Sequence, residues 1–178
     1  GDVYKRQHNV QNAVSASSAA SLIGIELETI SLALARFQGV KRRMEILASC
    51  EDYVIYDDFA HHPTEIFKTL SSLREKIGND QIIAVIEPRS RTMQSGLHDK
   101  EMTKALSPAD SVIWYEGQDV KRSMSAELKK AKAEVYFAAN ISEIIQITHQ
   151  IKTTKSNIVI MSNGDFSGLR ELIKKELD

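Results

Sequence analysis

The strongest constraint on the fold is a regular alternation of short apolar runs with longer amphipathic stretches, which continues from residue 44 almost to the end of the chain. The short runs are rich in β-branched and aromatic residues, as buried strands are, and the stretches between them have helical spacing. Strands that alternate with helices build a mainly parallel sheet with helices on both faces. We therefore predict an α/β domain with strands at residues 44–49, 53–56, 81–86, 111–114, 134–137 and 157–161, and helices at 63–77, 99–106, 125–132, 141–151 and 166–177.

The beginning of the chain departs from this alternation. Only residues 50–52 separate the first two predicted strands, which favours a β-hairpin. Two helical stretches precede the hairpin, at residues 9–21 and 26–37, and Gly24 between them suits the end of a helix. Residues 38–40 then have the character of a linker. We therefore predict a helical unit before the α/β domain.

Composition excludes several classes of protein. Lys and Arg number 23 against 24 Asp and Glu, and this balance gives no electrostatic reason to expect a nucleic-acid partner. No apolar run reaches the ~18 residues that cross a bilayer, and the polar first residues do not resemble a secretory signal. We therefore expect no membrane insertion and a cytoplasmic location. Cys50 is the only cysteine, so no internal disulfide can form, and we expect it to be buried as a small hydrophobic residue.

Residues 56–64 (YDDFAHHPT) concentrate charged and titratable groups where a strand gives way to a helix. The carboxyl ends of strands are where α/β proteins build ligand sites. Asp57, Asp58, His61 and His62 have the chemistry of zinc or manganese ligands, but no second group of ligands occurs elsewhere in the chain. We therefore expect a binding site without a metal of its own. A metal-dependent hydrolase that uses these four residues is an alternative, ranked third after the two given at the end of this section.

Four ordered segments make the chain resemble the Mur ligases, bacterial enzymes that use ATP to join amino acids or peptides to UDP-N-acetylmuramate. They are residues 39–45 (GVKRRME), 57–65 (DDFAHHPTE), 87–93 (EPRSRTM) and 161–166 (MSNGDF). The last two segments resemble the branch of the family that adds a murein tripeptide during cell-wall recycling. The branch that adds L-alanine typically has P-H-R-Y-T-R at the third segment, which this chain does not match.

The resemblance implies a Rossmann-like C-terminal domain at residues 39–178, preceded at residues 1–38 by the end of the central ATPase domain. Residues 1–7 do not resemble the family and are expected to be foreign to it. The chain contains no G-x-x-G-K-[ST] motif to hold phosphate and Mg²⁺. We therefore expect a fragment of the ligase, inactive alone.

ATP contacts are implied at four residues. Asp58 matches the aspartate that binds the ATP ribose, although a carboxylate before a helix could instead satisfy free backbone N–H groups. Arg43 matches an arginine that contacts ATP from the interdomain linker, whereas sequence alone would allow Lys41 or Arg42 equally well. Asn9 and Asn12 match two asparagines that read the adenine edge, and Asn9 could equally be a helix cap.

Substrate contacts are implied in the loops that follow two strands. Arg89 and Arg91 suit the carboxylates of the tripeptide, with surface salt bridges as the alternative. In the last loop Ser162 and Asn163 match the family, and small residues there allow backbone N–H groups to approach a ligand.

The remaining motif positions are two histidines and one acidic residue. His62 is expected to face the substrate, and His61 to orient the turn. Asp165 replaces the glycine that the family commonly has, and we expect it to cap the final helix.

The whole enzyme would join L-Ala-γ-D-Glu-meso-diaminopimelate to the lactyl carboxyl of UDP-N-acetylmuramate through an acyl phosphate. One alternative keeps the reaction with L-alanine as the amine. Another, from a different class, is a nucleotide- or peptide-binding module without catalysis.

Overall fold

The computed structural model describes residues 2–37, 40–89, 93, 98–117 and 124–177, with side chains between residues 10 and 176 of these ranges. The chain divides into two compact units, Gly1–Val40 and Lys41–Asp178. The domain boundary that the sequence predicts, between residues 38 and 39, stays a prediction. That the first unit is the end of a central domain remains a prediction.

The first unit is a hairpin of two helices, α1 (Asp2–Leu22) and α2 (Leu27–Arg36). The chain reverses at Gly24, whose φ of 88° lies in the left-handed region that glycine adopts without steric cost. Among its described side chains, Ile30 is the one large hydrophobic residue that is buried. This hairpin therefore has almost no core of its own. Its exposed large hydrophobic residues are Val10, Val14, Leu22, Ile23, Ile25, Leu27, Leu32, Leu34, Phe37 and Val40.

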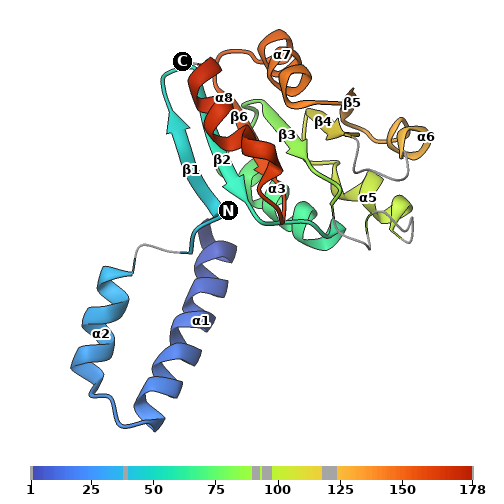
Figure 1. The fold of residues 1–178 in the computed structure, drawn as a ribbon. Coiled ribbons are helices and arrows are strands. Elements are labelled where there is room, and N and C mark those ends of the chain that lie inside the picture. Colours follow the sequence, from blue (N-terminus) through green and yellow to red (C-terminus); the bar gives the residue numbers. More distant parts are fainter. Residues whose placement is uncertain (1, 38–39, 90–92, 94–97, 118–123, 178) are drawn as a thin grey trace. The chain divides into compact units, whose positions relative to one another are not determined.

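The second unit is built on a sheet in which the described residues form six strands, in the order β1–β2–β6–β3–β4–β5 (Figure 1). β1 pairs antiparallel with β2, and all the other pairs are parallel. The predicted mainly parallel sheet and its N-terminal hairpin are confirmed. The strands are β1 (Arg43–Ser49), β2 (Tyr53–Asp58), β3 (Ile82–Ile86), β4 (Ser111–Tyr115), β5 (Glu134–Ala138) and β6 (Ser156–Met161).

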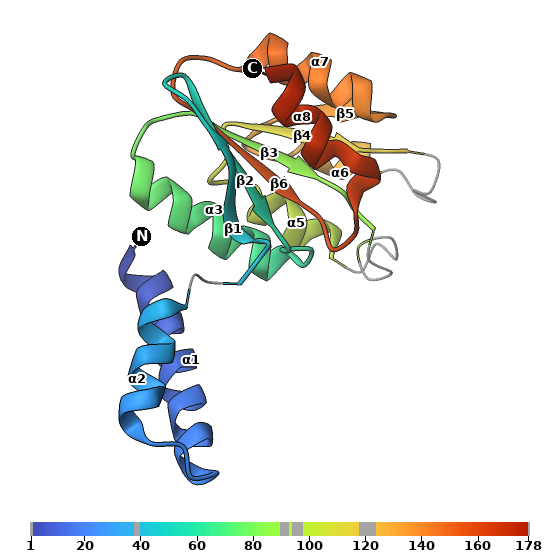
Figure 2. The ribbon, with the colours of Figure 1, turned by 60° about the vertical axis from the view of Figure 1, so that its left-hand side comes forward.

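Helices cover both faces of this sheet (Figure 2). Because successive side chains of a strand point to opposite faces, each central strand contributes to two cores. The first core packs against α3 (Pro63–Ile77), α5 (Asp99–Ala105) and α6 (Ser125–Leu128). The second packs against α7 (Ile141–Ile151) and α8 (Leu169–Leu177).

Three predicted boundaries in the second unit were wrong by two residues or more, and in the first unit α1 begins at Asp2 and not at residue 9. β2 continues through Asp58 instead of ending at residue 56, because β1 and β6 pair with it on either side. α6 ends at Leu128, well before residue 132. The last helix starts at Leu169, since residues 166–168 form a 3₁₀ turn in which Phe166 and Ser167 are left-handed, with φ of 53° and 49°.

Two features bear on surface chemistry. Cys50 is exposed in the hairpin connection, so the expectation that it is buried was wrong. Cys50 belongs to neither core of the sheet, because it lies in the turn between β1 and β2. No described helix is both long enough and apolar enough to cross a bilayer.

Candidate functional site

All four sequence motifs meet at the carboxyl edge of the sheet, three of them in loops that follow parallel strands. In the register of the parallel strands, Asp58 and Ile86 both lie opposite Met161. Backbone hydrogen bonds continue past the strand ends, from Ser162 N to Asp58 O at 3.2 Å and from Glu87 N to Met161 O at 3.0 Å. The loops at residues 59–62, 87–89 and 162–165 are therefore neighbours.

The connections after these strands diverge. β2 and β3 lead to α3 and α5 on one face, whereas β6 between them leads to α8 on the other face (Figure 1). Such a point, where adjacent connections leave in opposite directions, is the usual ligand site of open α/β sheets. We call the junction where these three loops meet the switch crevice, after the place that ligands take in such sheets.

Asp58 faces α3 and is 3% exposed. Its carboxylate accepts hydrogen bonds from the N–H of Met44 and of Ala60, both at 2.9 Å, and from the Thr69 hydroxyl at 3.4 Å. Burial raises the pKa of the Asp58 carboxyl, while these hydrogen bonds and the charge of Arg43 act in the opposite direction. The carboxylate binds the start of β1 and the turn before α3, so its predicted contact with ribose needs a local opening.

Asp57 faces the other side of the sheet and is 2% exposed. Its oxygens lie 2.8 Å from Arg170 Nε and 3.4 Å from Arg42 Nε, as ion pairs that lack the alignment of hydrogen bonds. Because Asp57 and Asp58 point to opposite faces, they cannot bind one ion together. Within the described residues no three His, Cys, Asp or Glu side chains gather as metal ligands. The opposite orientation of Asp57 and Asp58 argues against a hydrolase metal site built on both carboxylates.

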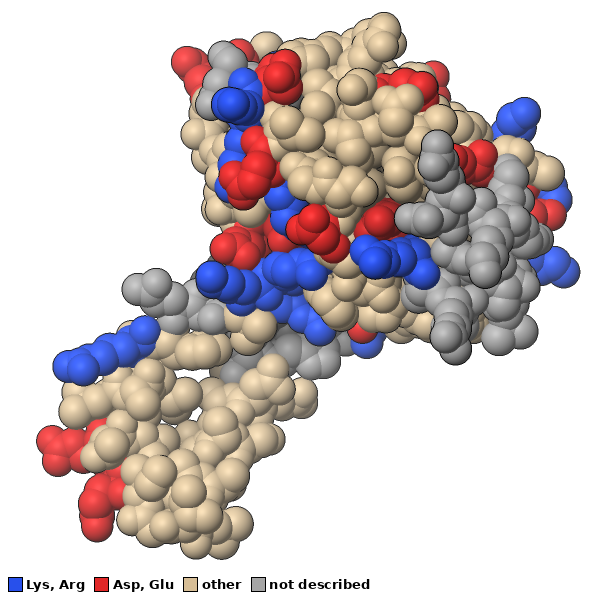
Figure 3. All heavy atoms as spheres, in the orientation of Figure 1, with Lys and Arg blue, Asp and Glu red and all other residues tan. Residues whose placement is uncertain are grey.

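The basic residues before β1 have distinct positions. Arg42, with a left-handed φ of 59°, donates through Nη2 to the carbonyl groups of Ser162 and Gly164, the latter at 2.9 Å. Arg43 is exposed and lies 5.9 Å from the centroid of the Phe59 ring. Figure 3 shows basic side chains gathered near the start of β1. The guanidinium of Arg42 is therefore occupied by contacts within the fold, whereas that of the exposed Arg43 is more accessible to a ligand.

The two histidines of the motif have separate contacts. His61 Nδ1 lies 3.0 Å from the carbonyl oxygen of Phe59 and 3.5 Å from Glu65, within the turn. His62 is the N-cap of α3, and its Nδ1 accepts from the N–H of Thr64 at 3.3 Å. The roles predicted for both histidines stay predictions.

A third histidine joins this group from the start of α5. The ring of His98 lies 4.8 Å from that of His62, in edge contact, and its Nδ1 is 2.9 Å from Glu101. Sequence reasoning missed this neighbour, because His98 precedes a different helix and no spacing pattern connects it to His62.

Ser162 is completely buried, with an exposed fraction of 0%. Its hydroxyl donates to Glu87 in a short hydrogen bond and accepts from the N–H of Gly164 at 2.8 Å. The residue therefore joins the ends of β6 and β3, and it has no free surface for the substrate contact predicted for it. Asn163 differs, since its Oδ1 is buried without a hydrogen-bond partner among the described residues.

Arg89 is exposed and lies against Gly164. A Cβ at Gly164 would come within 2.2 Å of Arg89 Nη1 and 2.8 Å of its Cδ, so a larger residue there would displace the side chain of this arginine. Arg91 lies outside the described residues. Asp165 is exposed and its side chain caps no N–H group, so the predicted helix cap was wrong, since the chain enters a left-handed turn there.

The predicted adenine contacts lie in the first unit. The backbone of Asn9 and Asn12 belongs to α1, the side chain of Asn12 is exposed, and that of Asn9 is outside the described part. These two predictions stay untested.

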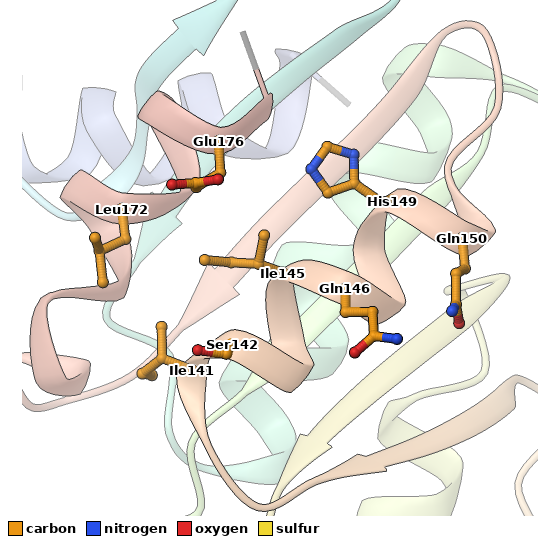
Figure 4. Close-up of a pocket in the computed structure, with 8 residues that line it drawn as sticks. All are labelled: Ile141, Ser142, Ile145, Gln146, His149, Gln150, Leu172 and Glu176. Carbon is orange, nitrogen blue, oxygen red and sulfur yellow. The ribbon is translucent and has the colours of Figure 1, made fainter.

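A second hollow lies away from the motifs, between α7 and α8 (Figure 4). It is an open groove of about 600 Å³ in which Ile145 and Leu172 face one another across the helices. None of the predicted site residues lines it, so its chemistry is separate from that of the switch crevice. Its lining consists of Ile141, Ser142, Ile145, Gln146, His149, Gln150, Leu172 and Glu176.

Comparison with known proteins agrees with this geometry. The model of the family "Mur ligase, glutamate ligase domain" matches residues 42–164, which include the strand ends that form the switch crevice. The chain therefore belongs to the Mur ligase family.

Individual relatives show which members of the family the chain is similar to. A UDP-N-acetylmuramate–L-alanyl-γ-D-glutamyl-meso-2,6-diaminoheptandioate ligase from Haemophilus influenzae is 35% identical over 172 residues, which are 96% of this chain and 38% of that protein. A crystal structure of a murein peptide ligase from Psychrobacter arcticus superposes with a TM-score of 0.78 at 35% identity, over 96% of this chain and 37% of that one. A UDP-N-acetylmuramate–L-alanine ligase from Streptococcus agalactiae is 42% identical over 165 residues, 89% of this chain and 36% of that protein. The chain spans less than two fifths of the length of each.

Proposed function

We propose that this chain is the C-terminal part of an ATP-dependent ligase that joins L-Ala-γ-D-Glu-meso-diaminopimelate to UDP-N-acetylmuramate in peptidoglycan recycling. The observation that carries the proposal is the meeting of the loops at residues 59–62, 87–89 and 162–165 in one switch crevice. Relatives named for this ligation cover nearly the whole chain and support it. Residues 1–38 would then belong to the central domain, and the enzyme would be cytoplasmic, where ATP and nucleotide sugars are found.

The reaction needs an activated carboxyl group and a positioned amine. ATP would phosphorylate the lactyl carboxyl of UDP-N-acetylmuramate, and the tripeptide amine would then displace phosphate from the acyl phosphate. The part of the protein represented by this chain would hold ribose on one side of the crevice and peptide on the other. Positioning of this kind lowers the barrier by bringing the reacting atoms together before reaction.

On the nucleotide side, we assign Arg43 and Asp58. Arg43 is exposed, and its guanidinium suits a phosphate oxygen or the adenine ring. An ionised carboxylate has about four lone-pair sites, so Asp58 retains capacity for one ribose hydroxyl after accepting its three present hydrogen bonds. Since Asp58 is 3% exposed, this contact would require the start of β1 to move. Asn9 and Asn12 remain the proposed adenine contacts.

Mg²⁺ is proposed as a companion of the ATP phosphates. The described residues offer no cluster of ligands for it, so we assign this chain no step that involves the metal.

On the peptide side, we assign Arg89 and Asn163. Arg89 suits a substrate carboxylate. The Oδ1 of Asn163 has no partner among the described residues and would accept from a substrate N–H group, which requires the loop to move because this atom is buried. Arg91 and His62 remain proposed contacts, and Ser162 would act by shaping the loop.

The test is an assay of the longer protein that contains this chain, with ATP and UDP-N-acetylmuramate and either the tripeptide or L-alanine as the amine. Turnover with the tripeptide alone is expected. Turnover with L-alanine alone would support the second candidate, a UDP-N-acetylmuramate–L-alanine ligase, which the 42% identity to the Streptococcus agalactiae enzyme favours. Binding of ATP or tripeptide by the longer protein without turnover of either amine would indicate a non-catalytic module.

A further inference from the structure

Two arginines from opposite ends of the second unit share one buried carboxylate. Arg42 precedes β1 and Arg170 lies in α8, and both side chains contact Asp57, at 3.4 Å and 2.8 Å. The carboxylate is 2% exposed, so solvent screens these pairs only weakly. One negative charge therefore holds together two guanidinium groups that would otherwise repel each other.

The same two arginines hold the backbone of the loop after β6. Arg42 Nη2 donates to the carbonyl groups of Ser162 and Gly164, and Arg170 Nη1 donates to that of Asp165 at 2.6 Å. Three of the four carbonyl groups of residues 162–165 thus accept from arginines that are paired with Asp57.

The backbone around this loop adopts conformations that need support. Arg42 has a φ of 59°, and Phe166 and Ser167 follow the loop with φ of 53° and 49°. Non-glycine residues in the left-handed region persist only where surrounding contacts stabilise them. The contacts that Asp57 organises contribute to this support, together with the burial of Phe166 and the hydrogen bond from Arg42 N to Glu45 at 2.9 Å.

The structure assigns Asp57 the role of a positioning residue that holds the 162–165 loop in the shape that binds the amine substrate. This assignment rests on the proposed function, in which Asn163 and Arg89 contact the peptide. Asp57 itself is shielded from substrate by the sheet and by both arginines, so it acts through them. Asp58, one residue away, faces the other side and would serve the nucleotide.

The test is steady-state kinetics of the longer protein with Asp57→Asn, which removes the charge and keeps the shape. The Michaelis constant for the tripeptide is expected to rise about tenfold or more, as misplaced binding groups cause, while that for ATP stays within about twofold. Equal rises in both constants, or no change in that for the tripeptide, would overturn the assignment.

A matched control is Asp110→Asn. Asp110 also pairs with an arginine, Arg74, at 2.5 Å, and accepts from a backbone N–H, that of Ile82, at 2.7 Å. Asp110 precedes β4 and therefore lies at the amino edge of the sheet, away from the switch crevice at the carboxyl edge. Its replacement should change neither Michaelis constant.

A second variant serves if Asp57→Asn does not fold. Arg42→Lys keeps the charge, but a lysine has one ammonium group, which cannot hold the two carbonyl groups as Arg42 Nη2 does and also contact Asp57 as Arg42 Nε does. It should raise the Michaelis constant for the tripeptide selectively, and an unchanged constant would overturn the assignment.

Failure of the proposed function would be recognised separately, as absence of tripeptide ligation by the unsubstituted protein. Amide hydrogen exchange of the 178-residue chain then tests the loop directly. Asp57→Asn, or Arg42→Lys in its place, should accelerate exchange at Gly164, whose N–H donates to the Ser162 hydroxyl, by about tenfold; Asp110→Asn should leave it unchanged. An unchanged rate in the charge-removing or the lysine variant would overturn the assignment.

Discussion

Asp57 and Asp58 are adjacent and almost equally buried, yet they contact different groups, because a strand alternates its side chains between two faces. Asp57 is surrounded by charged guanidinium groups and connects the first and last segments of the second unit. Asp58 accepts mainly from neutral backbone N–H groups and its pKa is raised by burial. The comparison teaches that a carboxylate pair in a sequence motif can be two sites, one on each side of a sheet.

The largest expected effect is that of Asp57→Ala on stability. The substitution leaves Arg42 and Arg170 without their shared counter-ion, and breaking a buried ion pair in this way costs about 3–5 kcal/mol. Urea unfolding of the 178-residue chain measures it, with fluorescence of Trp114, the one tryptophan, as a probe buried in β4. A loss no larger than that of a surface substitution would show that the two arginines find other partners.

A smaller difference is expected between Arg42→Ala and Arg43→Ala. Arg42→Ala removes the charged donor of two carbonyl groups and should lower the free energy of unfolding by about 1.5–3 kcal/mol. Arg43 is exposed, so its replacement should change that free energy by less than about 0.5 kcal/mol. In the longer protein the order should reverse for the Michaelis constant of ATP, which Arg43→Ala should raise more. Equal effects of the two substitutions on both measurements would contradict the division of roles.

The smallest expected effect is a pH dependence from Asp58, because its hydrogen bonds partly offset the effect of burial. A carboxyl whose pKa is raised by folding binds protons more tightly in the folded state. Its contribution to stability is therefore lost as the pH rises from the unfolded pKa, about 3.9, through the raised folded pKa. In urea unfolding at several pH values, Asp58→Asn should gain stability relative to the unsubstituted chain across that window. A loss of stability of Asp58→Asn relative to the unsubstituted chain as the pH rises would mean that the hydrogen bonds from Met44 and Ala60 lower the pKa of Asp58 more than burial raises it.

Much of the fold could be predicted from local pattern. The sheet, the hairpin and α3 follow from apolar runs and from Pro63 at the first turn of the helix. The sequence pattern predicts too early an end for β2, because Asp57 and Asp58 are charged and charged residues after an apolar run are typical of a turn. Had the strand been continued, its period of two would have placed the carboxylates on opposite faces.

The partners within the site could not be predicted in this way. Arg170 lies more than a hundred residues from Asp57 in sequence, and only the order of strands brings α8 beside β2. Arg42 and Arg43 are equivalent as sequence, and a left-handed φ at Arg42 sends the two side chains into different surroundings. The left-handed turn after Asp165 likewise depends on the packing of Phe166 in the core, which local propensity does not encode.

The order of strands also bears on how the protein is made. β6 is the last strand in sequence but lies between β2 and β3, so neither of these strands has its inner neighbour until residues 156–161 have left the ribosome. During synthesis, the hairpin of β1 and β2 and the group of β3, β4 and β5 are two separate half-sheets with open edges. Unpaired edges of this kind invite aggregation. Folding of the second unit therefore has to wait for residues 156–161, and a chain that stops before β6 would leave the two halves unjoined.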